Sequence, residues 1–314
     1  MECSGSQCRV WLMLVGLFVF LFSFIMNCLS GFGARSGVFR QRPADVTQKY
    51  RTPITPTQWT FYVWDFLHFW FVVMFIYFLL GLWRRNAYEW MYTTPAVLPY
   101  GFHVFFIINF CLNVMWLFLL DREWLLSLLI TSMLLMLTTY MMLFLSCQGL
   151  KVYGAWLSKY HNKDLWLLRI IVQNGVAVYA TWATLSSLLN MTIYLQHRTE
   201  TPTCDCALLA LLLLLMELLG WFLLENFYLD EHVRYILTIY PVVTLWLTGV
   251  LRNFESSDTQ VYTFAAFILA ISVILFVVRV VLVTWRHQKK QLFKHTEPIL
   301  SPVEISLTQN SLFL

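Results

Sequence analysis

Eight long apolar stretches constrain this chain more than any other feature of its sequence. Each is long enough to cross the hydrocarbon core of a bilayer as a helix, which takes about 20 apolar residues. Inside a bilayer every backbone polar group must be satisfied within its segment or by a neighbour, so such runs predict helices and not strands. We therefore expect an all-α membrane protein with about eight transmembrane helices. The stretches cover residues 10–29, 59–82, 100–120, 124–147, 165–195, 207–229, 235–251 and 261–285.

The composition agrees with burial in lipid. Hydrophobic residues make up 59% of the chain and charged residues only 12%, against about 25% charged in an ordinary soluble domain. The lipid bilayer is therefore the first partner that the sequence implies. The net charge of +4 is small, and no basic block is long enough to follow a phosphate backbone, which excludes a nucleic-acid partner.

Two stretches and the orientation allow more than one interpretation. Arg9 precedes the first stretch, as in a signal peptide, but a run of about twenty apolar residues favours a retained helix. The seventh stretch is the shortest and contains Pro241. Lys and Arg number eleven in the loops on the side of the N-terminus and eight on the other side, which favours cytosolic termini.

Three passages are more specific than hydropathy. Residues 53–64 (PITPTQWTFYVW) open the second apolar stretch. Residues 109–118 (NFCLNVMWLF) lie in the third stretch, ahead of a short turn at Asp121 and Arg122. Residues 179–190 (YATWATLSSLLN) lie in the fifth.

In order and spacing, these passages resemble the TspO/MBR family, the tryptophan-rich sensory and translocator proteins. That family has a Pro-Pro segment leading to Phe and then Val-Trp in helix 2, and an Asn-x-x-Trp element in helix 3. Its helix 5 has Tyr-x-x-Trp followed by Ala-x-x-Leu-Asn. The resemblance covers about residues 8–198. It departs from the family where Thr55 replaces a proline and where Phe61 stands in a place often given to glycine.

The resemblance implies a five-helix bundle that encloses a ligand cavity, covered by the long loop between helices 1 and 2. The family's ligands are tetrapyrroles, such as porphyrins and haem, and sterols. Its topology puts that loop in the cytosol, against the charge count, so the orientation stays open. We expect a TspO-like five-helix region over residues 1–203, a three-helix extension over 204–287 and a flexible polar tail over 288–314.

Ligand-contact residues follow from the motif positions. Trp64 and Trp182 match the two tryptophans that line the family's cavity. An indole ring offers a wide apolar face and one N–H donor, so two of them could hold a planar macrocycle. The alternative is that these residues are interfacial anchors or packing, because the chain has 14 tryptophans. The other matching motif positions are Trp59, Asn109, Asn113 and Trp116.

Two further patterns near the same helices have weaker specificity. Asn109 and Asn113 share a helix face, so we expect them to bond across helices. Leu189, Tyr194 and Arg198 fit a proposed sterol-contact pattern that is common by chance.

Charged residues inside the apolar stretches are the remaining candidates, because charge at membrane depth is costly and usually functional. Asp65 lies at the start of the second stretch. Glu217 lies in the middle of an apolar run, so it is expected to be protonated or paired with a group such as Arg279; Glu225 is a second acid on the same stretch. A structural bond that fastens the added helices and a proton or ion relay are the two interpretations.

The function that follows is binding of a hydrophobic planar ligand, a tetrapyrrole or sterol, for sensing or transport. The alternative is an eight-helix solute or ion transporter or channel that uses Glu217 and Arg279. An enzyme that degrades porphyrins is the least favoured, since no nucleophile–base pattern, P-loop or dinucleotide motif is present. No metal site or certain cofactor is implied, and haem or a porphyrin enters only as a ligand. A homodimer stays open.

Overall fold

The computed structural model describes residues 5–88, 90–92, 94–199, 201–253, 259–293 and 300–305. Within those ranges, seven helices are long and apolar enough to cross a membrane, and an eighth apolar helix is shorter. The all-α membrane class is therefore confirmed. The long helices are α1 (Gly5–Phe32), α3 (Val63–Trp83), α4 (Tyr100–Asp121), α5 (Leu125–Tyr160), α7 (Gly175–Arg198), α8 (Thr203–Leu223) and α11 (Thr259–Lys289), and the short one is α10 (Ile239–Arg252).

Short elements connect or extend these helices. Two are single turns of 3-10 helix, two are π-helical segments that continue a long helix, and three are brief α-helices. They are η1 (Gly33–Ser36), α2 (Pro43–Lys49), η2 (Gln58–Tyr62), α6 (Asn162–Leu167), η3 (Leu168–Asn174, π), η4 (Leu224–Tyr228, π) and α9 (Asp230–Val233). Most of the predicted polar tail lies outside the described residues.

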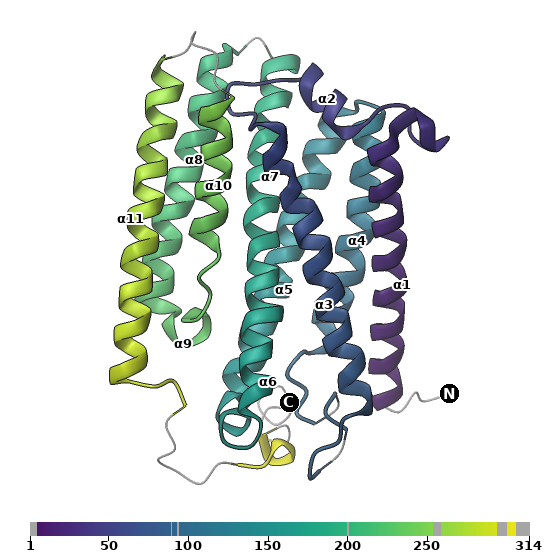
Figure 1. Ribbon diagram of the computed structural model, residues 1–314, viewed down its shortest axis with the longest axis vertical. Helices are drawn as coiled ribbons and strands as arrows, with labels where there is room; N and C mark the ends of the chain where they lie inside the picture. The colour runs from purple at the N-terminus through teal and green to yellow at the C-terminus, as the bar shows by residue number, and fades with distance from the viewer. Residues whose placement is uncertain are drawn as a thin grey trace.

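The helices run side by side as a bundle (Figure 1). The last helices, α8, α10 and α11, lie on one side of the bundle, and α1 and α4 lie on the other. The main hydrophobic core runs from Met13 of α1 to Ile268 of α11, so both halves of the chain share it.

The α6–η3–α7 span is the centre of the bundle. In its most apolar window 89% of the residues are buried, against 22–39% in the other spans. Its sequence explains this position, because small residues such as Gly175, Ala177, Ala180 and Ala183 let neighbouring helices approach closely. Helices α3, α5, α8 and α10 all pack against α7.

The chain breaks its helical course between α8 and α10. Non-helical backbone at membrane depth is tolerated only where protein groups satisfy it. Asn174 supplies two such bonds, from its Nδ2 to the carbonyl of Tyr235 (2.9 Å) and from the Leu237 N–H to its Oδ1 (3.1 Å). Arg279 donates to the carbonyls of Val233 (3.1 Å) and Arg234 (3.3 Å). The half-buried side chain of Asn174 and the fully buried side chain of Arg279 therefore allow α10 to be short.

The long first loop, expected to be extended before helix 2, contains α2 and two 3-10 turns. It lies across one end of the bundle (Figure 1). The Asp121 carboxylate accepts hydrogen bonds from the backbone N–H groups of Arg40 (2.7 Å) and Gln41 (2.9 Å). At its far end the Thr57 N–H donates to the carbonyl of Gly249 in α10 (3.1 Å). The loop thus spans from the α4–α5 turn to α10.

Candidate functional site

A cavity of about 470 Å³ lies between α5, α7, α8 and α10. This volume is within the range of about 300–1,000 Å³ that holds drug-sized ligands. Its walls are mainly aliphatic and aromatic, and its lining includes Leu143, Phe144, Ala177, Leu185, Leu214, Leu218, Trp221 and Val243. An apolar ligand of that size would fill it.

The cavity opens sideways between α5 and α8. Tyr140 and Phe144 line it from α5 and are 41% and 54% exposed. Glu217 of α8 and Leu224 of η4 line it and are exposed as well. Exposed lining residues on two facing helices mark a mouth on the outer surface of the bundle, where lipid surrounds a membrane protein.

Few polar groups face the cavity. The Thr181 hydroxyl donates to the carbonyl of Ala177 (2.9 Å), and the Thr184 hydroxyl donates to that of Ala180 (3.0 Å). His232 lines the far end, and its Nδ1 is buried without a hydrogen-bond partner. Gln148, the Tyr140 hydroxyl and the indole N–H of Trp221, which has no hydrogen-bond partner, also line the cavity. These groups and Glu217 could orient a ligand.

The two motif tryptophans meet elsewhere in the bundle. The rings of Trp64 and Trp182 pack edge to face, with centroids 6.4 Å apart at 82°. Trp182 is fully buried, and Trp246 of α10 packs on it with centroids 5.2 Å apart. Neither motif tryptophan lines the 470 Å³ cavity. Because the rings touch, a planar ligand could lie between them only if they separated.

Trp246 is a neighbour that sequence reasoning missed. The resemblance ended near residue 198, and Trp246 lies in a helix with no counterpart in a five-helix bundle. Only contact between α7 and α10, which the motifs do not encode, brings Trp246 against Trp182.

The motif asparagines bond across helices, as predicted. Asn109 Nδ2 donates to the carbonyl of Leu135 in α5 (3.0 Å). Asn113 Oδ1 accepts from the Ser23 hydroxyl (3.0 Å) and from Asn27 Nδ2 (2.8 Å) in α1. Both amides therefore fasten α4 to its two neighbours.

The remaining sequence-derived candidates lie apart from the cavity. Trp59 is 38% exposed at the entrance to α3. Trp116 is half-buried and packs near Leu117 and Leu120. Asp65 is exposed in the first turn of α3.

The residues of the sterol-contact pattern differ in their exposure. Leu189 is buried in the core, Tyr194 is half-buried against it, and Arg198 is exposed. Only Tyr194 and Arg198 of this pattern are therefore accessible to a ligand on the outer surface.

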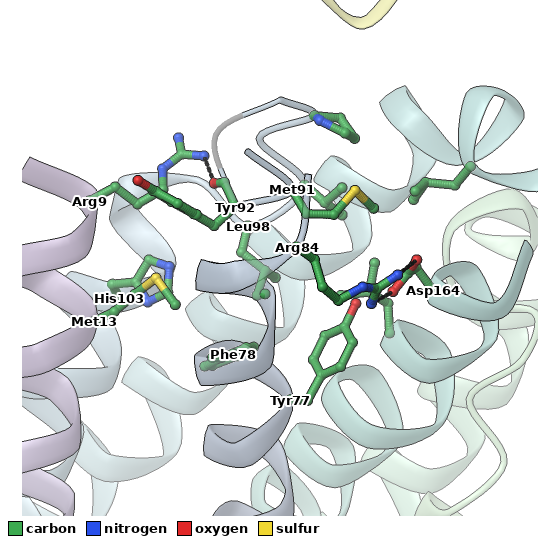
Figure 2. A pocket seen from close by; sticks show the side chains of 15 residues that line it. Arg9, Met13, Tyr77, Phe78, Arg84, Met91, Tyr92, Leu98, His103 and Asp164 are labelled. Atoms are coloured by element: carbon green, nitrogen blue, oxygen red, sulfur yellow. Dashed lines mark hydrogen bonds and ion pairs between the residues drawn. The ribbon is translucent and has the colours of Figure 1, made fainter. Parts of the chain in front are cut away.

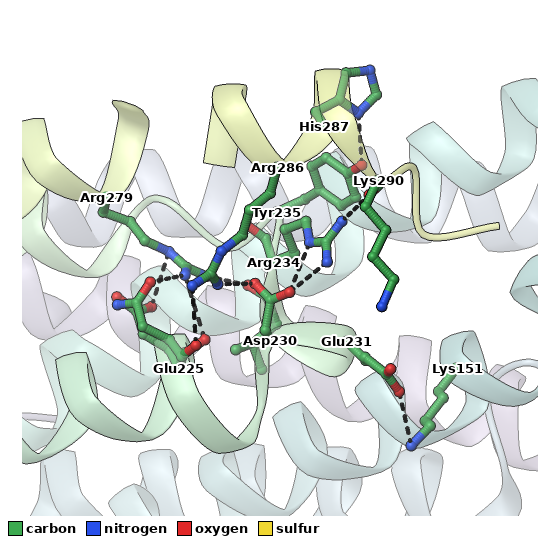
Figure 3. Close-up of polar contacts among 12 residues, drawn as sticks. Lys151, Glu225, Asp230, Glu231, Arg234, Tyr235, Arg279, Arg286, His287 and Lys290 are labelled. Atoms are coloured by element: carbon green, nitrogen blue, oxygen red, sulfur yellow. Dashed lines mark hydrogen bonds and ion pairs between the residues drawn. The ribbon is translucent and has the colours of Figure 1, made fainter. Parts of the chain in front are cut away.

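The pairing of Glu217 with Arg279 is wrong. Arg279 pairs with Glu225, with Nε 3.4 Å from Oε2, and both side chains are fully buried (Figure 3). The Tyr240 hydroxyl donates to the other carboxylate oxygen. Arg279 also donates to the side chain of Asn226 (2.8 Å). Glu225 and Asn226 lie in the π-helical segment η4, and this segment brings both side chains to Arg279. Glu217 lies eight residues before Glu225.

A second set of ion pairs continues this network toward the end of α11. Asp230 pairs with Arg234 and with Arg286 (2.5 Å), and Arg234 also donates to the carbonyl of Lys290 (2.7 Å) (Figure 3). These bonds join α9 to α11. The contacts of Arg279 are structural, but they differ from the expected bond between the added helices and the rest of the protein. All its partners, from Glu225 to Arg234, lie within the added region, so the charge joins these added segments to one another.

A smaller cavity of about 80 Å³ lies at the N-terminal end of α1 (Figure 2). Arg9 and His103 line one side of it, and Arg84 forms a two-bond ion pair with Asp164 on the other (2.6 and 2.8 Å). Since one water needs about 10–15 Å³ of such volume, this cavity could hold a few waters and no planar macrocycle.

The bundle, its apolar spans and its lateral cavity define a multi-pass α-helical membrane protein. The family model described as "TSPO-like protein" matches residues 13–279, so the chain belongs to this family. The match extends over α8, α10 and most of α11, beyond the region of the motifs. No curated protein and no solved structure shows significant similarity to the chain.

Proposed function

We propose that this protein binds a hydrophobic planar ligand, of the tetrapyrrole or sterol class, in the cavity between α5, α7, α8 and α10. The observation that carries the proposal is the cavity, with its volume of about 470 Å³, its apolar walls and its lateral mouth. Ligand pockets are typically concave and apolar with a few convergent polar groups. Binding from the bilayer serves sensing or transport of the ligand.

The lining is compatible with both ligand classes. A sterol would bury its fused rings against Leu143, Leu214 and Val243. A tetrapyrrole would stack on the aromatic side chain of Trp221. His232, whose Nδ1 has no partner, offers an imidazole nitrogen to an iron-containing macrocycle.

In this proposal the motif tryptophans do not contact the ligand but support the helix that forms one cavity wall. Helix α7 presents Thr181 and Thr184 to the cavity and Trp182 to the aromatic cluster around Trp64. Packing of Trp182 therefore sets the position of the α7 wall, and the ligand need not touch the ring.

The test is a binding titration with haem, protoporphyrin and cholesterol on the protein in phosphatidylcholine nanodiscs. Gly220→Trp fills the cavity, because Gly220 lines it and a Cβ there meets no heavy atom within 4 Å. Gly31→Trp is the matched control, since Gly31 is equally unobstructed but lies on α1. We expect saturable binding of at least one compound, lost in Gly220→Trp and kept in Gly31→Trp.

Two results would contradict the proposal. One is an absence of saturable binding, and the other is unchanged affinity in Gly220→Trp. The pair Trp64→Phe with Trp182→Phe separates the two ligand positions. Affinity kept in the double variant supports the cavity, whereas affinity lost in a folded double variant but kept in Gly220→Trp indicates a ligand between the tryptophans.

A further inference from the structure

Glu217 is the feature of the cavity that the proposed function leaves unused. It lies on the cavity wall in the second half of α8, and no hydrogen bond or ion pair joins its carboxylate to any described residue. Its neighbours along the helix, Leu214 and Leu218, are apolar and buried. An ionisable group at membrane depth is costly, and it usually marks a pathway or a binding partner.

The hydroxyl groups on the cavity wall cannot supply the missing donor. Thr181 donates its proton to the carbonyl of Ala177, and Thr184 donates its own to that of Ala180. The hydroxyls of Tyr140 and Thr184 are 2.6 Å apart. When the Thr184 proton goes to the Ala180 carbonyl, Tyr140 is the donor in that bond. In this arrangement all three hydroxyl protons point away from Glu217.

We infer that the ligand of this cavity carries one basic nitrogen, which binds Glu217 as an ammonium group while an apolar ring system fills the remaining space. An ammonium supplies both what the carboxylate lacks, a positive charge and N–H donors. Charge-assisted hydrogen bonds are about twice as strong as neutral ones, and a low-dielectric surrounding strengthens the attraction. The inference rests on the proposed function, because it assumes that the cavity holds a ligand.

The Glu217 carboxylate also favours some ligand classes over others. The propionate groups of haem and protoporphyrin would meet a like charge if they entered near Glu217. A sterol hydroxyl would donate one hydrogen bond without compensating the charge. A planar or steroid-like body with an amine satisfies both the aliphatic walls and the acid.

Two fluorescent probes of one shape test the inference, 1-pyrenemethylamine and 1-pyrenemethanol. Both carry the same planar ring system, and only the amine is charged at neutral pH. Binding is measured by pyrene anisotropy in phosphatidylcholine nanodiscs, with empty nanodiscs subtracted. Because hydrogen bonds to charged groups contribute more than neutral ones, we expect the amine to bind about tenfold or more tightly than the alcohol.

Two variants test whether Glu217 causes the tighter binding of the amine probe. Glu217→Gln keeps the shape of the residue and removes the charge, so it should abolish the advantage of the amine while leaving the alcohol unchanged. Asp65→Asn is the matched control, because Asp65 is an exposed acid on α3 that does not line the cavity, and the advantage should persist. Equal affinity of the probes in the natural protein, or an undiminished advantage in Glu217→Gln, would overturn the inference.

The failure of the inference and that of the proposed function give different results. If both probes bind equally and Gly220→Trp removes both, the cavity binds ligands and the amine requirement is wrong. If neither probe binds saturably while haem, protoporphyrin or cholesterol does, the amine requirement is wrong and the cavity function stands. If none of the five compounds binds, both are wrong.

Discussion

Removal of the Arg279 guanidinium should unfold the corner of the bundle where α8 ends and α10 begins. Arg279 is fully buried, forms an ion pair with Glu225 and donates to the side chain of Asn226. It also donates to the carbonyl of Val233, which accepts a turn bond from the Ile236 N–H as well, and to that of Arg234. The Arg279 side chain thus neutralises the buried Glu225 carboxylate and also bonds carbonyl groups of the non-helical segment before α10.

The magnitude follows from what each variant leaves behind. Arg279→Met keeps most of the side-chain length and strands the Glu225 carboxylate, and breaking a buried pair in this way costs about 3–5 kcal/mol. Glu225→Gln should cost less, about 1–3 kcal/mol, because the Tyr240 hydroxyl can still donate to the amide oxygen. The double variant should be less destabilised than the sum of the two, since no charge remains.

The assay is reversible unfolding by sodium dodecyl sulfate in mixed micelles, followed by circular dichroism. Arg252→Met is the control, because Arg252 is exposed at the end of α10 and its loss should change stability by less than about 0.5 kcal/mol. A cost below about 1 kcal/mol for Arg279→Met, or a double variant worse than the sum, would refute the reasoning.

Three further outcomes follow from the packing and the first loop. Trp182→Ala should destabilise the protein by about 3–5 kcal/mol in the same assay, because it empties a fully buried site, and Trp182→Phe should cost less. Gly249→Ala should cost about 1–3 kcal/mol, because its Cβ would overlap Thr60 of η2; a neutral effect would contradict this close packing. Hydrogen bonds from Lys49, Gln41 and Tyr50 lower the pKa of Glu123 to about 2 from its ordinary 4.5. Since the folded-state pKa is depressed, the stabilisation of the loop is complete above pH 4.5 and is lost as the pH falls toward 2. Hydrogen exchange of residues 40–50, corrected for intrinsic rates, should therefore rise between pH 6 and pH 3 and rise at pH 6 in Glu123→Gln.

The class of fold could be predicted from hydropathy because the bilayer leaves so few alternatives to a helix. The eighth apolar helix illustrates the limit of that reasoning. Pro241 lies in the first turn of α10, where proline is tolerated, so the helix begins there instead of spanning from residue 235. The cross-helix bonds of Asn109 and Asn113 could also be predicted, since an amide buried in an apolar helix needs a partner.

The cavity and the ion pair could not be predicted, because both depend on how helices distant in sequence meet. Glu217 and Glu225 lie on the same helical span, and hydropathy does not distinguish them. The π-helical turn at the end of α8 directs Glu225 to Arg279 and leaves Glu217 on the cavity wall. Likewise, the motifs identified Trp182 but not its contact with Trp246, which closes the space around it.

Photo-crosslinking tests the central claim most directly. A cholesterol analogue with a diazirine on its ring system is bound to the protein in nanodiscs and irradiated, and the adducts are located by peptide mass spectrometry. We predict adducts on cavity residues such as Phe144, Leu218 and Val243, suppressed by Gly220→Trp and by excess unlabelled cholesterol. Adducts confined to the outer face of α1, or unaffected by filling the cavity, would contradict the account.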